Sequence, residues 1–145
     1  VTADPPLEWG HRHDPGRSRY AMVSREGSAV FLITRGEVAV QLSDRVMRKI
    51  EREMQEDEDD DGALGTVIKD VVLGGVKALL NHSLECPLDE LRDVRYRDGR
   101  LELISLDGER LFEDVQINDR DLLESFRPQD ARAFVEEFHR LVRVR

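Results

Sequence analysis

Alternating apolar and polar positions mark residues 19–43 as a run of antiparallel strands. The segments RYAMVS, AVFLIT and EVAVQLS each alternate with the period of a strand and are separated by turn residues. Closing the second turn on Arg35-Gly36 creates an apolar face three pairs deep, in which Ile33 faces Val38, Phe31 faces Val40 and Ala29 faces Leu42.

A second block of short strands covers Leu84–Ile117 and is divided by Asp-Gly turns. Asp98-Gly99 favours a two-residue hairpin, because both residues adopt positive φ at low cost. The apolar pairs would then be Val94 with Leu103 and Tyr96 with Leu101. On the other face Arg95 would meet Glu102, so a slip by one residue would bury charge and the register is well specified.

The turn at Asp107-Gly108 leaves two registers open. A two-residue loop would place Leu103 opposite Phe112 and Ile104 opposite Leu111, which makes both faces of the strand pair apolar. A bulge after Gly108 is the alternative.

Helical spacing interrupts the strands at 44–83, which we predict to be a helical insertion. Residues 44–55 carry an apolar stripe after an N-cap at Ser43 or Asp44, and 63–83 carry apolar residues at helical spacing around Gly74-Gly75. Between them, 56–62 (EDEDDDG) lacks the calcium-loop spacing and is predicted to be a solvated linker.

The chain is predicted to close on an amphipathic helix. We expect a short strand at Leu122–Phe126 and then a helix whose first turn contains Pro128 and Asp130. Its apolar stripe consists of Ala131, Phe134, Val135, Phe138, Leu141 and Val142. With 1–18 as an irregular lead-in, the prediction is a single α+β domain over 19–145, with antiparallel strands and a helical insertion.

Composition excludes some partners. The net charge of -9 argues against sequence-independent nucleic-acid binding and against attraction to anionic membranes. One cysteine, Cys86, rules out an intrachain disulfide and favours a reducing compartment, so we expect a cytoplasmic protein. We see neither a signal peptide nor a membrane span.

Candidate chemistry is sparse. His11, His13 and Asp14 form an H-x-H-D cluster, but a metal site would need further ligands, and solvated loop histidines are the favoured interpretation. Cys86 could be a nucleophile with His82, but its apolar neighbours favour a buried thiol. We therefore predict no catalytic residues, no metal ligands, no cofactor and no enzymatic activity.

Three segments resemble the bacterial pleckstrin-homology-like (PH-like) family. They are AVFLITRGEVAV, CPLDELRDVRYRDGRLELISLDG and the start of the last helix at Pro128–Phe134. The resemblance implies an antiparallel PH-like barrel or sheet closed by a C-terminal helix. The insertion at 44–83 distinguishes this chain from a typical small PH-like domain.

The resemblance implies a binding module rather than an enzyme. PH-like domains bind phosphoinositides, peptides or other proteins, and bacterial versions often assemble into rings. In the loop after the first strand, the one basic residue, Arg25, is next to the acidic Glu26, and there is no lysine. We therefore rank protein binding or self-association above lipid or small-ligand binding. An enzyme of unknown class is the remaining alternative. The predicted partner surface is the apolar stripe of the insertion, made of Leu64, Val67, Val71, Val72, Val76 and Leu79.

Overall fold

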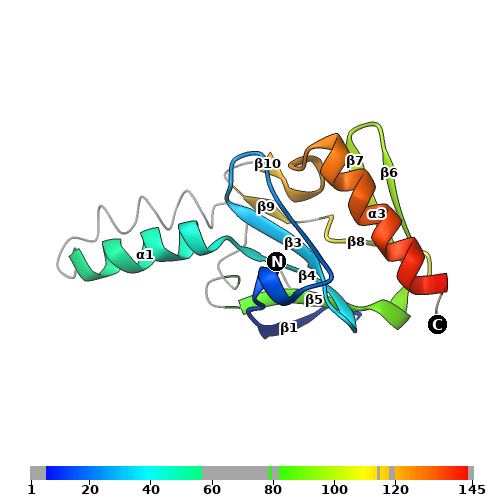
Figure 1. Cartoon of the computed structure of the whole chain (residues 1–145), viewed down its shortest axis with the longest axis horizontal. Coiled ribbons are helices and arrows are strands. Elements are labelled where there is room, and N and C mark those ends of the chain that lie inside the picture. The colour runs from blue at the N-terminus through cyan, green and yellow to red at the C-terminus, as the bar shows by residue number, and fades with distance from the viewer. Residues whose placement is uncertain (1–5, 57–78, 80–81, 114, 118–119, 144–145) are drawn as a thin grey trace.

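The computed structural model of the chain describes residues 6–56, 79, 82–113, 115–117 and 120–143 (Figure 1). Its largest sheet is antiparallel and has five strands in the order β1-β5-β4-β3-β2. These strands are β1 (Glu8–His11), β2 (Tyr20–Val23), β3 (Ala29–Ile33), β4 (Glu37–Leu42) and β5 (His82–Pro87).

A second antiparallel sheet has three strands in the order β6-β7-β8. They are β6 (Leu91–Arg97), β7 (Arg100–Ser105) and β8 (Arg110–Leu111), and a short ribbon of β9 (Gln116–Ile117) and β10 (Arg120–Asp121) follows. With helices α1 and α3 this confirms the predicted α+β class. In the described part of the chain the strands form separate sheets and do not close into one barrel.

Two hairpins have the predicted registers. Around Arg35-Gly36, β3 and β4 pair Ile33 with Val38, Phe31 with Val40 and Ala29 with Leu42. Around Asp98-Gly99, β6 and β7 pair Val94 with Leu103, Arg95 with Glu102 and Tyr96 with Leu101. Asp98 and Gly99 both have positive φ, 53° and 76°, as a two-residue hairpin turn requires.

The turn at Asp107-Gly108 differs from the two-residue closure. Leu103 faces Leu111 and Ile104 faces Arg110, one residue away from the register of a two-residue loop. The N–H of Ser105 donates to the carbonyl of Glu109, and Gly108 lies at φ 86°. This is a three-residue loop with glycine in the left-handed region, which agrees with the bulged alternative.

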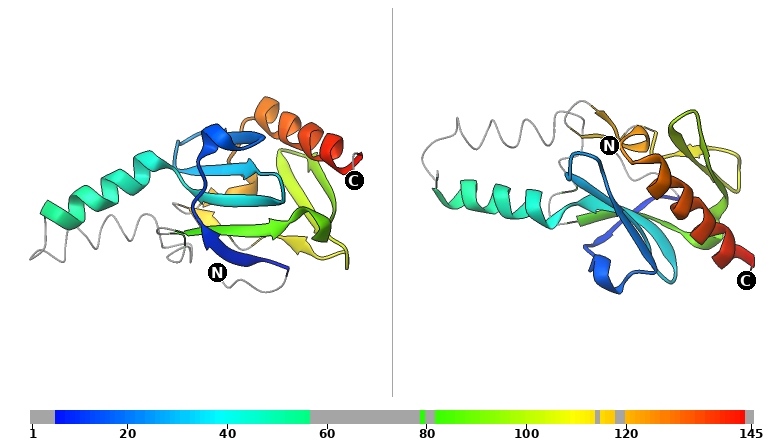
Figure 2. Two further views of the ribbon diagram at one scale, coloured as in Figure 1. Left: turned by 60° about the horizontal axis from the view of Figure 1, so that its bottom comes forward. Right: turned by 45° about the horizontal axis from the view of Figure 1, so that its top comes forward.

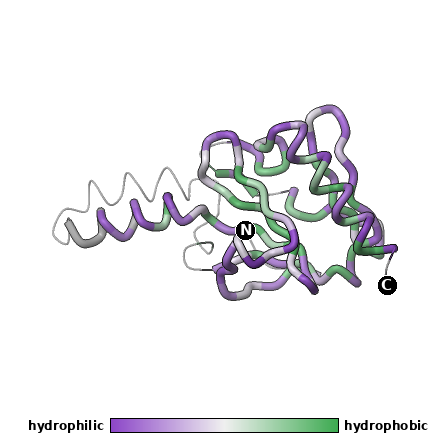
Figure 3. The backbone as a smooth tube through the Cα atoms, viewed as in Figure 1, coloured by the Kyte–Doolittle hydropathy of each residue, from purple (hydrophilic) through white to green (hydrophobic). Residues whose placement is uncertain are grey.

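The core lies between the two sheets and helix α3 (Pro128–Arg143). Phe31 is at its centre, with ring centroids 5.0 Å from Phe134, 5.3 Å from Phe112 and 6.0 Å from Phe126. Ala131, Phe134 and Phe138 of α3 are buried, so the predicted stripe does face the core. Figure 3 shows the apolar positions gathered where the sheets and α3 meet.

Helix α1 (Asp44–Glu56) begins after Ser43, whose side-chain oxygen accepts the N–H of Val46 at 3.3 Å. The helix extends away from the sheets, and its base is tied to the core by the buried Met47 (Figure 2). The helical insertion was predicted to continue to residue 83. Its predicted end is wrong, because β5 begins at His82. The rest of the second predicted helix, apart from Leu79, lies outside the described residues.

Two other predictions are corrected. The lead-in 1–18 is not irregular throughout, because Glu8–His11 pairs with β5 as an edge strand and Pro15–Arg17 forms a 3₁₀ turn. The segment predicted as a strand at Leu122–Phe126 contains a 3₁₀ helix, Leu122–Glu124. The Asp121 carboxylate accepts the N–H of Leu123 at 3.0 Å, and this capping bond favours the helical turn over an extended chain.

Strands β1 and β2 are the two edges of the five-stranded sheet, so the chain between them must cross that sheet. This connection, residues 12–19, is called the strap, and it runs over the face opposite the core (Figure 2). Gln41, which points to that face and is 0% exposed, accepts the N–H of His13 at 2.8 Å and donates to its carbonyl at 2.9 Å. The strap is therefore held to β4 by a buried amide.

Candidate functional site

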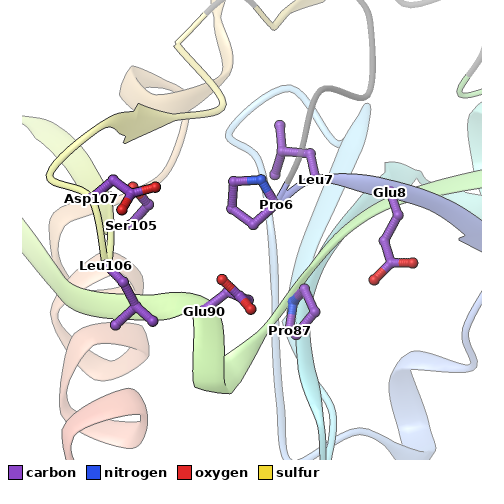
Figure 4. A pocket seen from close by; sticks show the side chains of 8 residues that line it. All are labelled: Pro6, Leu7, Glu8, Pro87, Glu90, Ser105, Leu106 and Asp107. Atoms are coloured by element: carbon purple, nitrogen blue, oxygen red, sulfur yellow. The ribbon is translucent and has the colours of Figure 1, made fainter.

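A groove opens where the start of β1 meets the end of β5 and the turn between β7 and β8. It has a volume of about 420 Å³, within the range of ligand sites. Figure 4 shows the side chains that line it: Pro6, Leu7, Glu8, Pro87, Glu90, Ser105, Leu106 and Asp107. We call it the junction groove.

Local backbone chemistry shapes the junction groove. Pro87 ends β5 and is followed by the 3₁₀ helix Leu88–Glu90, which turns the chain into the second sheet. The N–H of Leu106 donates to the carbonyl of Glu90 at 3.1 Å, so the β7–β8 turn is tied to this corner. This side of the groove is thus held by a main-chain hydrogen bond.

The lining of the junction groove combines apolar and acidic side chains. Pro6, Leu7, Pro87 and Leu106 supply the apolar surface, and Leu106 stays 56% exposed. Glu8, Glu90 and Asp107 bring three carboxyl groups, and the described lining residues include neither lysine nor arginine. An exposed leucine near three carboxyl groups suits an apolar ligand that carries positive charge.

A second polar constellation lies under the strap, on the far face of the five-stranded sheet. His13, Glu37 and Glu85 each point one donor atom into a common space, and these atoms all lie within 4.8 Å of one another. His13 Nε2 contacts the Glu85 carboxylate and lies 3.8 Å from Glu37 Oε1. We call these three residues the His–Glu cluster.

The prediction that His13 is a solvated loop histidine is therefore wrong. Its side chain is 24% exposed, and that of its partner Glu85 is 13% exposed. The strap folds onto the sheet instead of running through solvent, and this places His13 against β4 and β5. His11 does remain exposed, at the edge of the sheet opposite His82.

Burial and charge both act on Glu85. Desolvation raises the pKa of Glu85 above its ordinary value of 4.5, and the neighbouring Glu37 raises it further, whereas His13 opposes the shift. The side chain has room because residue 10 is glycine: a Cβ there would overlap the Glu85 carboxylate.

Of the six residues of the predicted partner surface, the structure describes Leu79. Leu79 is 1% exposed and belongs to the core, so its side chain packs inside this domain. The other five residues of the stripe lie outside the described residues, and their role stays a prediction: Leu64, Val67, Val71, Val72 and Val76.

The other candidate residues are not brought together into a site. Cys86 is buried in the core, and desolvation raises the pKa of its thiol to about 12, so it is protonated at neutral pH. His82 is exposed on β5. His139 on α3 is partly buried, with Nε2 at 3.0 Å from Asp93 Oδ1, as expected of a structural histidine.

Sequence reasoning missed Glu37 and Glu85 as partners of His13, and it missed the junction groove. The available signal was weak: Glu85 is an acid within the otherwise apolar segment LECP, and Glu37 opens β4. Their proximity follows from the pairing of β4 with β5, in which Glu37 faces Pro87 and Ala39 faces Glu85. That pairing spans the insertion and has no local turn to reveal it.

Comparisons with protein-family models, curated protein sequences and solved structures return no significant match. None of the described helices is long and apolar enough to cross a bilayer.

Proposed function

We propose that this chain is a non-enzymatic, PH-like binding module that takes a basic, partly apolar protein segment in the junction groove. The observation that carries the proposal is the composition of the groove lining, which joins an exposed Leu106 and other apolar residues with three carboxyl groups. The proposal continues the sequence-based preference for protein binding.

The order of the elements supports the PH-like assignment. Strands β2, β3, β4 and β5 form a meander of four, β6, β7 and β8 form a meander of three, and α3 closes the chain. Helix α3 packs against β2 and β6, one strand from each sheet. A PH-like domain has this succession of strands and final helix, and strand β1 and the insertion are additions to it.

Charge complementarity defines the occupant. Three carboxyl groups in the lining, in a chain with net charge -9, favour arginine or lysine in the partner and disfavour acidic segments. The apolar lining residues favour an aliphatic or aromatic side chain next to that basic residue. A short peptide segment offers both within the length of the groove.

The direct test is selection of peptides from a random displayed library on the full chain, followed by affinity measurement and NMR mapping of the selected peptides. We expect enrichment of peptides that pair arginine or lysine with an apolar residue, with shifts at the amides of residues 87–90 and 105–107. Leu106→Ser should weaken binding about tenfold, since burying a half-exposed leucine contributes roughly 1–2 kcal/mol.

The matched control is Val23→Ser. Among the described residues, Val23 and Leu106 are the large apolar side chains that stay exposed, at 49% and 56%. Val23 lies on β2, which contributes nothing to the described groove lining, so its substitution should leave peptide affinity unchanged. Acidic selected peptides, shifts confined to another face, or equal losses for both variants would contradict the proposal.

Lipid binding receives less support. At the first strand loop, Glu26 is paired with Arg120 at 2.5 Å, and the hollow beside it also contains Asp121 and Glu124. The acidic groups there oppose a phosphorylated headgroup. Titration with phosphoinositide-containing vesicles should therefore show no binding above that to neutral vesicles.

Self-association through the insertion stays a separate proposal from the sequence. Its test is sedimentation of the full chain at several concentrations, with Val72→Asp and Val76→Asp as variants. A dimer or ring that these variants dissociate would support it. A strict monomer in which both variants unfold the chain would exclude it.

A further inference from the structure

We propose that the His–Glu cluster, His13, Glu37 and Glu85, binds one divalent transition-metal ion, with Zn²⁺ as the representative of the class. This site lies on the face of the five-stranded sheet that points away from the core, and the junction groove contributes none of its ligands.

The ligand set and its spacing fit a metal. One imidazole nitrogen and two carboxylate oxygens are ordinary zinc ligands, and three protein ligands are enough where water or another small ligand takes the fourth position. Bonds of about 2.1 Å hold tetrahedral ligands roughly 3.4 Å apart. The three donor atoms lie within 4.8 Å of one another, so binding needs them to approach by no more than about 1.4 Å.

Charge repulsion within the cluster also favours a bound cation. Glu37 and Glu85 occupy diagonal positions on adjacent antiparallel strands and point to the same face. Like charges so placed repel, and the repulsion grows with burial. The register adds Glu8 directly opposite Glu85 on β1. A single imidazole compensates at most one of these charges, whereas a divalent ion compensates two.

The surrounding residues hold the site open and in place. The buried Gln41 fixes both main-chain polar groups of His13, so the imidazole is delivered to the sheet at a defined point. Gly10 leaves the space that the Glu85 carboxylate occupies. Thr34 donates to Glu37 Oε1 at 3.1 Å and orients that carboxylate. Hydrogen bonds and packing of this kind orient metal ligands and raise metal affinity.

The cluster is also accessible. His13 and Glu37 line an open hollow of about 530 Å³ between the strap and the β3–β4 turn, which Arg12, Arg17 and Arg35 also border. A metal held by the three ligands would keep a coordination position toward this hollow, open to water or to an anionic ligand.

The test is calorimetric titration of Zn²⁺ into the full chain after treatment with a chelator at pH 7.5, with Co²⁺ absorption as an independent probe of coordination. We expect one Zn²⁺ per chain and a cobalt spectrum of low coordination number. Glu85→Gln keeps the shape of the side chain and should weaken Zn²⁺ binding by at least about 100-fold. Mutation of residues that merely hydrogen-bond to metal ligands lowers metal affinity roughly 10–100-fold, and loss of a ligand should cost at least as much. Glu37→Gln, at a more exposed position, provides the same test if the first variant does not fold.

Two controls separate this site from others. His139→Gln removes a histidine of the same type, paired with a single carboxylate of Asp93, and should leave Zn²⁺ affinity unchanged. His11 and His82 face each other across β1 and β5 and are an obvious competing pair, so His11→Gln should also have no effect. The proposal is overturned by absence of saturable binding, by undiminished binding in the cluster variants, or by loss of binding in His11→Gln.

Discussion

Replacing Gln41 with methionine should release the strap from the sheet. Gln41 is 0% exposed, and its side-chain amide makes two hydrogen bonds to His13, one accepted at 2.8 Å and one donated at 2.9 Å. Methionine has nearly the same length and volume and fills the same space without forming either bond. The substitution therefore removes polar contacts while leaving the packing largely unchanged.

The expected cost is about 2–3 kcal/mol of unfolding free energy. A main-chain group deprived of its partner costs about 1–3 kcal/mol when buried, and His13 is only partly buried, so each lost bond should cost about 1–1.5 kcal/mol. For a chain of this size each kcal/mol lowers the melting temperature by about 3–4 °C. Gln41→Met should therefore melt roughly 6–12 °C lower.

Urea denaturation and hydrogen exchange measure this together. The His13 amide should lose protection in the variant, whereas the amides of β6 and β7 should change only with global stability. Gln116→Met, at an exposed position on β9, is the control and should stay within about 0.5 kcal/mol of the parent. A cost below about 0.5 kcal/mol for Gln41→Met, or a His13 amide that stays protected, would refute the account of the strap.

Two further predictions concern stability. Arg100 binds Asp121 at 2.5 Å and also contacts Glu113, and these hydrogen bonds raise the pKa of Arg100 above its ordinary range. Arg100→Met leaves both carboxylates without this partner and should lower the free energy of unfolding by about 1–2 kcal/mol in urea denaturation. This cost is smaller than that of breaking a fully buried ion pair, because the three side chains are partly exposed. An unchanged urea midpoint would contradict this. Burial raises the pKa of Cys86 from 9.0 to about 12, so the unfolded chain loses the thiol proton first. The contribution of the buried thiol to the free energy of unfolding is fully present below pH 9. It is lost as the pH rises toward 12, by up to about 1.4 kcal/mol per pH unit. Between pH 8 and 10.5 the free energy of unfolding of Cys86→Ala should therefore fall less steeply with pH than that of the parent. Parallel curves of unfolding free energy against pH for the two proteins would contradict the burial argument.

The local hairpins and the last helix could be predicted from the sequence. The pairs around Arg35-Gly36 and Asp98-Gly99 are confirmed, because a two-residue turn fixes the register of the strands that it joins. The stripe of α3 is confirmed for a related reason, since its period places Phe134 and Phe138 on one face whatever the partner is. The strand predicted at Leu122–Phe126 was wrong because local hydrogen bonds to Asp121 and Leu122 hold a 3₁₀ turn there.

The two candidate sites required the tertiary structure. The His–Glu cluster joins His13, Glu37 and Glu85, and the junction groove joins residues 6–8, 87–90 and 105–107. Each depends on β5 pairing with β4 across the insertion and with β1 from the start of the chain. The entropy of closing a long connection rises only slowly with its length, so separation along the chain does not indicate which strands will meet. Local patterns determine how each hairpin pairs, whereas the burial of whole sheet faces selects which hairpins, and therefore which polar side chains, lie side by side.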